Sequence, residues 1–186
     1  MIFELNEVLL EDEPRTVTMM ASEGRMTCIT GATPVRLTRW MHALMGFVPA
    51  KSGFISIDGE PLTPASAEVF RQLMAFAPAR LEREGQVKTY DPPSVQDVFS
   101  LKANRDLPIS NGILGEEMRR VAAGSSDPRV QLLAVAALLD RPILLVDNPL
   151  PEAVLYLKSK AVEGHIVIVS SCMSEIVGMA DQIVEI

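Results

Sequence analysis

The stretch Met26–Thr38 constrains the fold of this chain more than any other part of the sequence. The run MTCIT is apolar and rich in residues that favour β-strands, and it ends at Gly31. After Thr38, the segment RWMHALMGF has the apolar spacing of an amphipathic helix. A strand, a loop that begins with glycine and a helix follow one another in the order that a phosphate-binding loop requires.

The loop itself keeps only part of the residues that bind phosphate. The established pattern is G-x-x-x-x-G-K-[ST], in which backbone N–H groups and a lysine hold the phosphates and the hydroxyl binds magnesium. Gly31 and Thr38 fit this pattern, but Arg36 and Leu37 stand in place of the second glycine and the lysine. Pro34, inside the loop, has no N–H group to donate. The sequence therefore predicts the frame of a nucleotide site without most of its chemistry.

Two residues of the loop have alternative interpretations. Thr38 would supply a hydroxyl to a magnesium ion, or it would cap the N-terminus of the following helix, as threonine commonly does. Arg36 would act as a substitute cation for phosphate, although it comes one residue before the position of the lysine. Both alternatives stay open at this point.

Composition excludes several classes of function. The formal charge is −7 and the pI is near 4.9, which gives no basic surface for nucleic acid. The two cysteines lie in apolar runs, so we expect reduced thiols without a disulfide or a metal site. The apolar run Val130–Leu139 is far shorter than the ~20 residues of a membrane-spanning helix, and the N-terminal segment lacks the features of a signal peptide. We expect a cytoplasmic protein that does not insert directly into a membrane.

Strand and helix patterns alternate through the second half of the chain. This alternation predicts an α/β fold with a parallel, doubly wound sheet. Two β-rich runs at the start, Met1–Leu10 and Arg15–Met20, predict an antiparallel hairpin. No repeat or linker interrupts the pattern, so we expect residues 1–186 to form a single domain.

The order of these segments resembles the ATP-binding subunit of ABC transporters over nearly the whole chain. The phrases that carry the resemblance are CITGATPVRLT, LMGFVPAKSGFISIDGEPL, AFAPA, SVQDVFSL, AGSSDPRVQLLAVAALL, ILLVDNP and VSSCMSEIVGMADQIVEI. The resemblance implies a P-loop NTPase-type sheet flanked by helices, with an N-terminal antiparallel β piece. It also implies a core formed by residues 1–93 and 128–186 and a shortened helical subdomain at about 94–127.

The resemblance further assigns a role to each position of the family's catalytic machinery. Asp147 matches the aspartate that supports magnesium, while Asn148 replaces the catalytic glutamate. Ser171 stands for the histidine that contacts the γ-phosphate, and Ala79 for the glutamine that senses it. A neutral amide cannot accept a proton from water at useful pH. We therefore expect no catalytic residue at these positions.

These substitutions predict a catalytically inactive, or pseudo-ATPase, subunit with a structural or regulatory role in a membrane transport assembly. Its partners would be a membrane permease subunit at the inner face of the membrane, together with an intact ABC ATPase or a second copy of itself. We expect no cofactor. The alternative is Mg-ATP binding without efficient hydrolysis, on a site made of Gly31, Thr33, Arg36, Leu37, Thr38 and Asp147. A second alternative is a free-standing interaction protein.

Overall fold

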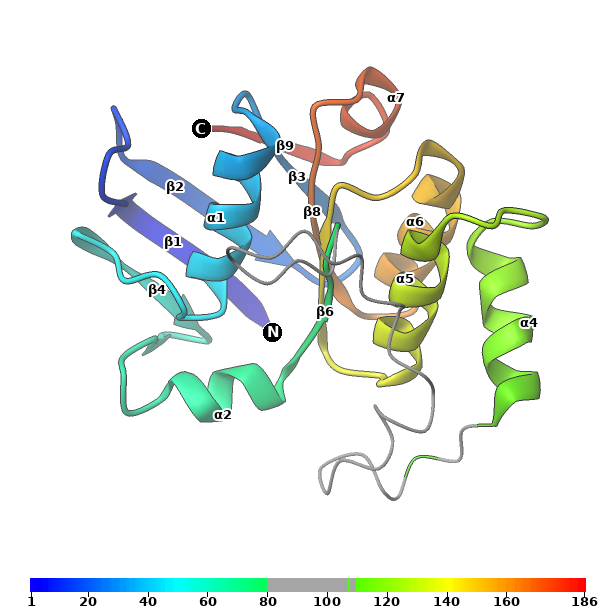
Figure 1. The fold of residues 1–186 in the computed structure, drawn as a ribbon. Coiled ribbons are helices and arrows are strands. Elements are labelled where there is room, and N and C mark those ends of the chain that lie inside the picture. Colours follow the sequence, from blue (N-terminus) through cyan, green and yellow to red (C-terminus); the bar gives the residue numbers. More distant parts are fainter. Residues whose placement is uncertain (80–106, 108–109) are drawn as a thin grey trace, which may run out of the picture.

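The computed structural model describes residues 1–79, 107 and 110–186, and these residues form two β-sheets with helices packed between and beside them (Figure 1). Within this part of the chain, one sheet has the strand order β2-β1-β4-β5 and the other has the order β6-β7-β8-β3-β9. The predicted helix within Ser94–Leu101 lies outside the described residues.

The first sheet is antiparallel and begins with the predicted hairpin. It consists of β1 (Ile2–Leu9), β2 (Val17–Ser22), β4 (Ser52–Ile57) and the short β5 (Glu60–Pro61). A bulge shifts the register of β1 against both of its neighbours after Leu5 and Asn6. Gly53 lies opposite this bulge with φ = 77°, and a Cβ on it would come within 2.3 Å of the Glu7 carbonyl oxygen. The strand pair therefore requires glycine at position 53.

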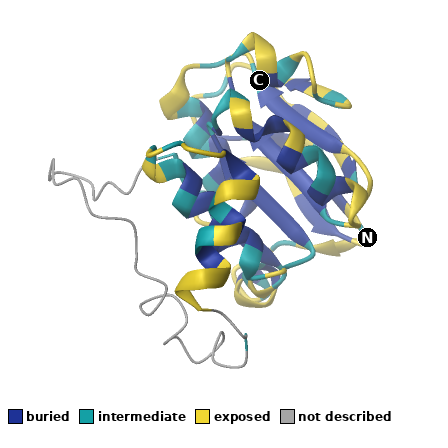
Figure 2. Cartoon of the chain, turned by 90° about the vertical axis from the view of Figure 1, so that its right-hand side faces the viewer, coloured by how far each residue is buried: buried dark blue, intermediate teal, exposed yellow. Residues whose placement is uncertain are grey.

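The second sheet is entirely parallel, as the alternation of elements predicts. It consists of β3 (Met26–Thr30), β6 (Met74–Ala77), β7 (Ile143–Asp147), β8 (Ile166–Ser170) and β9 (Gln182–Glu185). Every residue of β7 and β8 is buried, which is typical of a parallel sheet covered on both faces (Figure 2).

Helices cover the two faces of the parallel sheet unequally (Figure 1). On the face toward the antiparallel sheet lie α1 (Pro34–Leu44) and α2 (Ala67–Gln72). On the other face lie α4 (Asn111–Val121), α5 (Pro128–Leu138), and α6 (Val154–Val162), which follows the 3-10 turn η2 (Pro151–Ala153). A short α7 (Ser174–Val177) precedes β9. The side chains of β7 alternate between the two cores, Ile143 and Leu145 on one face and Leu144 and Val146 on the other.

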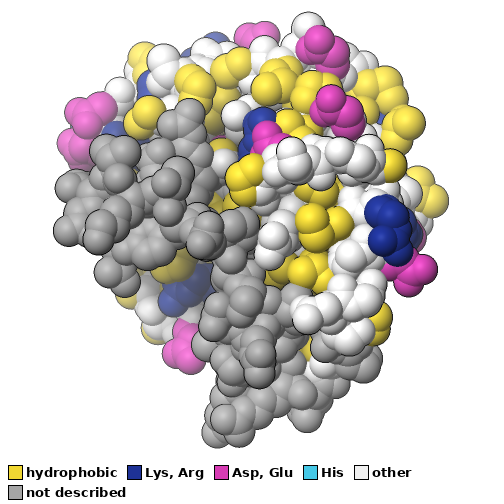
Figure 3. Space-filling model, turned by 45° about the vertical axis from the view of Figure 1, so that its right-hand side comes forward, with side chains coloured by type: hydrophobic (Ala, Val, Ile, Leu, Met, Phe, Trp, Pro, Cys, Tyr) yellow, Lys and Arg dark blue, Asp and Glu magenta, His cyan; other side chains and the backbone are white. Residues whose placement is uncertain are grey.

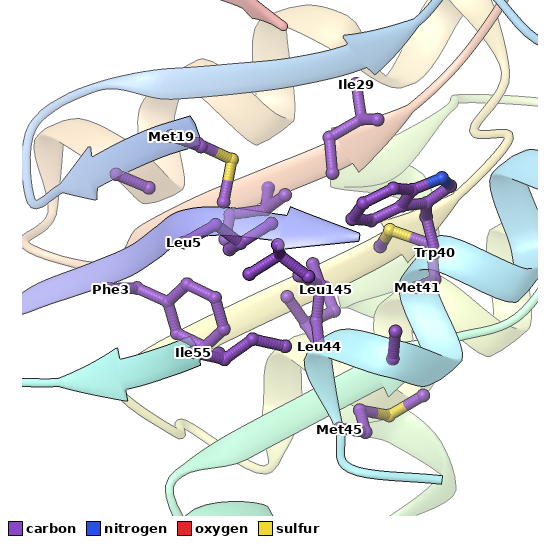
Figure 4. Packing of buried hydrophobic residues seen from close by; sticks show 14 of the residues in the cluster. Phe3, Leu5, Met19, Ile29, Trp40, Met41, Leu44, Met45, Ile55 and Leu145 are labelled. Atoms are coloured by element: carbon purple, nitrogen blue, oxygen red, sulfur yellow. The ribbon is translucent and has the colours of Figure 1, made fainter. Parts of the chain in front are cut away.

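The larger core lies between the two sheets and includes the buried face of α1 (Figure 4). Trp40, Met41 and Leu44 are each fully buried there, which confirms the prediction that this face of the helix packs into the interior. The spacing of apolar residues in RWMHALMGF also places Phe47 on this face, but Phe47 is 60% exposed. The reason is that α1 ends at Leu44 and Gly46 adopts a positive φ, which turns the chain away from the helix axis.

None of the helices in the described residues is long and apolar enough to cross a membrane.

Candidate functional site: the loop after β3 and the ends of β7 and β8

The candidate site lies where three neighbouring parallel strands end. β3 leads into Gly31, β7 ends at Asp147 and β8 ends at Ser170. β8 pairs with both β3 and β7, so their carboxyl ends meet at one edge of the sheet. Ligands of open α/β sheets commonly bind at this edge, because loops and helix N-termini converge there.

Asp147 is held by two hydroxyl groups. Its carboxylate accepts a hydrogen bond from the Thr38 hydroxyl at 2.6 Å and one from the Ser170 hydroxyl at 2.6 Å. Asp147 is only 3% exposed. A buried carboxylate needs such donors, because burial without hydrogen bonds costs several kcal/mol. The structure thus brings together Thr38 and Asp147, the two residues that would support magnesium in the alternative of Mg-ATP binding.

The loop between β3 and α1 is shorter than the sequence pattern suggests, because α1 begins at Pro34. Thr33 is the N-cap residue, and its hydroxyl accepts a hydrogen bond from the Arg36 N–H group at 3.5 Å. The Leu37 N–H group donates to the Thr33 carbonyl at 3.0 Å. The interpretation of Thr38 as the cap is therefore wrong, because Thr38 lies inside the helix. Of the amides that would cradle a phosphate, one is absent at Pro34 and those of Arg36 and Leu37 are already paired.

Leu37, at the position of the lysine, points into the protein interior. Its side chain belongs to the core between the two sheets and is 2% exposed. A lysine at this position would need to move its ammonium group out of the core to reach a phosphate. The first turn of α1 therefore places a buried leucine at the position where a phosphate-binding loop has a lysine.

Arg36 is paired with Glu13, which lies in the turn between β1 and β2. The guanidinium Nε donates to the carboxylate at 3.2 Å, and Nη2 makes a second, short contact with the other carboxylate oxygen. The Glu13 side chain is only 3% exposed. This hydrogen bonding raises the pKa of Arg36 above its usual value. Arg39 lies 3.7 Å from Asp12 in the same turn, so both arginines of α1 face carboxylates.

Asn148 follows Asp147 in the left-handed region of backbone conformation, with φ = 49°. Its N–H group donates to the Ser170 carbonyl at 2.9 Å, and its own carbonyl accepts from Arg129 Nη1 at 3.1 Å. Asparagine adopts this conformation more readily than most residues other than glycine. The residue is thus suited to its backbone conformation and carries no group that could act as a general base.

Comparisons with solved structures agree on one architecture. An ATP-binding subunit of an ABC transporter matches all of this chain and 86% of its own, with a TM-score of 0.72 at 16% sequence identity. The chain has the fold of ABC transporter ATP-binding subunits. A bacterial ABC transporter cassette described as dimeric matches with a TM-score of 0.70, 14% identity, and 99% and 94% coverage of the two chains. A Clostridium perfringens protein described as part of an ABC transporter complex gives 0.67, 13%, and 98% and 83%.

Sequence comparisons alone find no such likeness, since neither a protein-family model nor a curated protein sequence matches the chain. The ABC ATP-binding fold is therefore recognised here through its three-dimensional arrangement and the short phrases of the sequence.

Asp127 begins α5 as its N-cap, with Pro128 in the first turn of the helix. The carboxylate accepts from the Arg129 N–H group at 2.9 Å and forms an ion pair with the Arg129 guanidinium at 2.8 Å. The hydrogen bond from the Arg129 side chain lowers the pKa of Asp127. Arg129 also reaches the Asn148 carbonyl, so it joins α5 to the end of β7.

The resemblance to ABC ATP-binding subunits also points to Ser171 and Ala79. Ser171 is fully buried, and its hydroxyl accepts a hydrogen bond from the Met173 N–H group at 3.1 Å in the turn after β8. Ala79 is the last described residue after β6 and has only a methyl side chain. Beside Asp147 and Arg129 lies a small hollow of about 10 Å³, which is the space of roughly one water molecule.

The site offers ligands for the magnesium ion of a magnesium–nucleotide complex. Thr38 and Asp147 together offer the hard oxygen atoms that Mg²⁺ prefers. For a phosphate, the loop offers no lysine, and the N–H groups of Arg36 and Leu37 are bonded to Thr33. Among the described residues, no group of three or more His, Cys, Asp or Glu side chains could hold a metal ion by itself.

Sequence reasoning missed three residues that define this site. Ser170 could have been predicted, because it ends a strand that neighbours the strand of Asp147. Glu13 gave a weaker signal as part of the acidic turn EDEP. Arg129 gave none, since its contact with the Asn148 carbonyl depends on how α5 packs against β7.

Proposed function

We propose that the chain is a pseudo-ATPase on the ABC ATP-binding fold, which serves as a structural or regulatory subunit of a membrane transport assembly. The observation that carries this proposal is the position of Leu37, which is buried beneath the first turn of a helix where nucleotide binding requires a lysine in an open loop. A site of this form has no cation for the phosphates and few free amides.

The charges around the loop support the same proposal. Arg36 directly precedes Leu37 in the chain, and the Glu13 carboxylate pairs with its guanidinium. A nucleoside triphosphate would meet the carboxylates of Glu13 and Asp12, which pair with the arginines of α1. Within the described part of the chain, the amide of Asn148 and the hydroxyl of Ser171 stand where a base and a histidine would be needed to activate water.

The structural neighbours support the partners that we propose. One neighbour is described as part of an ABC transporter complex and another as dimeric. We therefore propose that this chain lies at the cytoplasmic face of a membrane, bound to a permease subunit and to an intact ABC ATPase or a second copy of itself. Affinity purification of the chain from its own cells, followed by mass spectrometry, tests this part. Recovery without any membrane protein would favour a free-standing interaction protein.

Calorimetric titration with Mg-ATP, combined with thermal unfolding, tests the pseudo-ATPase proposal. A ligand at 100 times its dissociation constant stabilises a protein by about 2.7 kcal/mol, which is a clear shift in melting temperature. We expect neither heat nor shift for the wild type. The matched comparison is the triple variant Pro34→Gly, Arg36→Gly, Leu37→Lys, which restores the loop. Micromolar binding by the wild type would by itself overturn the proposal. The triple variant is compared only after circular dichroism shows that it is folded, because Leu37→Lys is expected to destabilise the core.

A second candidate function is Mg-ATP binding without hydrolysis. The contact between Thr38 and Asp147 favours it, because it presents the two groups that a magnesium ion would bridge. Asp147→Asn distinguishes the two candidates. It would abolish magnesium-dependent nucleotide binding if the second candidate held, whereas a pseudo-ATPase has no such binding to lose.

A further inference from the structure

The buried side of α4 has a charged residue at its centre. Leu114 and Val121 are buried near its two ends, and Met118 is half-buried against the same core. Between them lies Glu117, whose side chain is only 8% exposed. Glutamate is rarely buried in proteins unless it is paired, because removing its charge from water is costly. α4 stands at the outer side of the helical layer, beyond α5 and α6 (Figure 1).

Glu117 finds its partners mainly on α6. The Tyr156 hydroxyl donates a short hydrogen bond to one carboxylate oxygen, and Lys160 Nζ lies 3.9 Å from the same atom. The other oxygen accepts from Arg120 Nη1 at 2.8 Å, one turn further along α4. Lys160 and Arg120 both reach Glu163 as well, at 2.8 Å and 3.6 Å.

The five side chains form one connected group between α4 and α6. Arg120 and Lys160 also lie 5.9 Å and 5.6 Å from the centre of the Tyr156 ring. Two carboxylates face two cations, so the group is balanced in charge. Burial and the bond to Glu117 raise the pKa of Tyr156, which keeps its hydroxyl protonated and able to donate. On this face of the molecule, acidic and basic side chains lie next to each other at several points (Figure 3).

We propose that Glu117 and Tyr156 form a polar latch, which makes α4 a conditionally docked helix that opens and closes as a unit against α5, on which it packs, and α6, which carries Tyr156. A leucine at position 117 would hold α4 by burial alone. The carboxylate instead makes docking depend on hydrogen bonds that are either all formed or all lost, because a half-satisfied buried group is costly. This proposal does not rest on the proposed function, since none of its residues belongs to the candidate nucleotide site.

Native-state hydrogen exchange of the α4 amides tests the latch, because local openings appear there as faster exchange than in the sheet. We expect wild-type α4 amides to exchange in common, and faster than those of β7 and β8. Glu117→Gln and Tyr156→Phe should each raise the exchange rates of α4 about tenfold and leave those of β7 and β8 unchanged. Glu116→Gln, on the exposed side of the same helix, is the matched control and should change nothing.

The double variant Glu117→Leu, Tyr156→Phe gives the sharpest outcome. Replacing both partners by apolar groups removes the Tyr156 donor and the Glu117 acceptor together, while Arg120 and Lys160 keep Glu163 as their carboxylate. We therefore expect α4 to exchange at the wild-type rate or more slowly. The effects of the two positions would then be strongly non-additive. Additive loosening would overturn the proposal. So would a wild-type protein in which α4 opens only when the whole sheet unfolds, a result that requires no variant to fold.

Discussion

The hydroxyl of Thr38 donates a 2.6 Å hydrogen bond to the carboxylate of Asp147, a residue 109 positions later in the chain. This bond joins α1 to the end of β7, and the Ser170 hydroxyl adds the end of β8 through the other carboxylate oxygen. Three elements of the fold thus meet at one buried charge. The bond thus fixes the start of α1, whose loop carries no lysine, to the carboxyl end of β7.

Removing either hydroxyl from Asp147 should destabilise the fold. Thr38→Val and Ser170→Ala each leave a buried carboxylate with one donor fewer, and each should lower the free energy of unfolding by about 1–3 kcal/mol. Thr27→Val is the control, because the buried Thr27 hydroxyl donates to a neutral amide oxygen of Gln182 at 3.2 Å. Its loss should cost only about 0.5–1.5 kcal/mol. Urea unfolding measures all three, and a Thr38→Val cost no larger than the control would contradict the role assigned to the pair.

Leu37→Lys alone should unfold or severely weaken the protein. The side chain lies in the core, and an unpaired ammonium group there should cost about 3 kcal/mol or more. Val35→Lys is the matched control on the same helix, because Val35 is 80% exposed. That change should lie within about 0.5 kcal/mol of the wild type. Equal stability of the two variants in chemical denaturation would show that position 37 faces solvent.

The backbone at Asn148 should favour glycine over any branched side chain. Asn148→Gly should be close to neutral, whereas Asn148→Val should cost about 1–2 kcal/mol, because its φ of 49° is unfavourable for a β-branched residue. Thermal and urea unfolding measure the difference.

Asn148→Glu should not produce ATP hydrolysis, because the loop around Leu37 would still lack a lysine for the phosphates. Measurable phosphate release by that single variant would refute our account of the loop.

Two glycines with nearly the same φ should respond differently to alanine. Gly53 and Gly59 have φ of 77° and 84°, but only Gly53 has backbone within 4 Å of an added Cβ, the nearest atom at 2.3 Å. Gly59→Ala should cost about 1–2 kcal/mol from backbone strain alone. Gly53→Ala should cost clearly more, because it must also displace the bulge at Glu7. Equal losses in unfolding experiments would mean that the bulge can move freely.

Stability should fall as the pH drops below about 4. The pKa values of Asp127, Glu163 and Asp181 are lowered, chiefly by hydrogen bonds from Arg129, Lys160 and the Met26 N–H group. The unfolded chain therefore binds more protons in this range, so the stabilisation is present above the unfolded pKa values of about 4 and is lost as the pH falls through the lower folded values. Urea titrations between pH 3 and about 7 should show this decline. The variant Asp181→Asn should show a shallower one.

Most of the fold could be predicted from the sequence because its strands and helices carry clear patterns. β7 and β8 are apolar up to their last residues, Asp147 and Ser170, which indicates strands buried on both faces of a parallel sheet. The alternation of apolar and polar residues in β1 indicates a strand with one buried face. The start of α1 was readable too, since Thr33 followed by Pro34 is a typical cap and first residue, yet the glycine–threonine pattern suggested a longer loop. The domain boundaries at about 94–127 stay a prediction.

The contacts that Arg36 and Leu37 make could not be predicted from the sequence. Arg36 and Glu13 are joined only when the hairpin turn folds back over α1, which depends on the packing of the first sheet against the second. The burial of Leu37 likewise depends on which face of α1 is turned toward the core. Because α1 begins at Pro34, Leu37 lies within the helix and on its buried face. The residue types show that the loop has no lysine. The contacts that Arg36 and Leu37 make instead depend on tertiary packing.

The core position of Leu37 has a consequence for protein engineering. A single change to lysine would place a charge among apolar side chains, and its cost in stability would come before any gain in nucleotide affinity, because Pro34 and Arg36 would still occupy the loop. A nucleotide site could therefore be built at this position only by redesigning the first turn of α1 together with the apolar side chains that Leu37 now contacts.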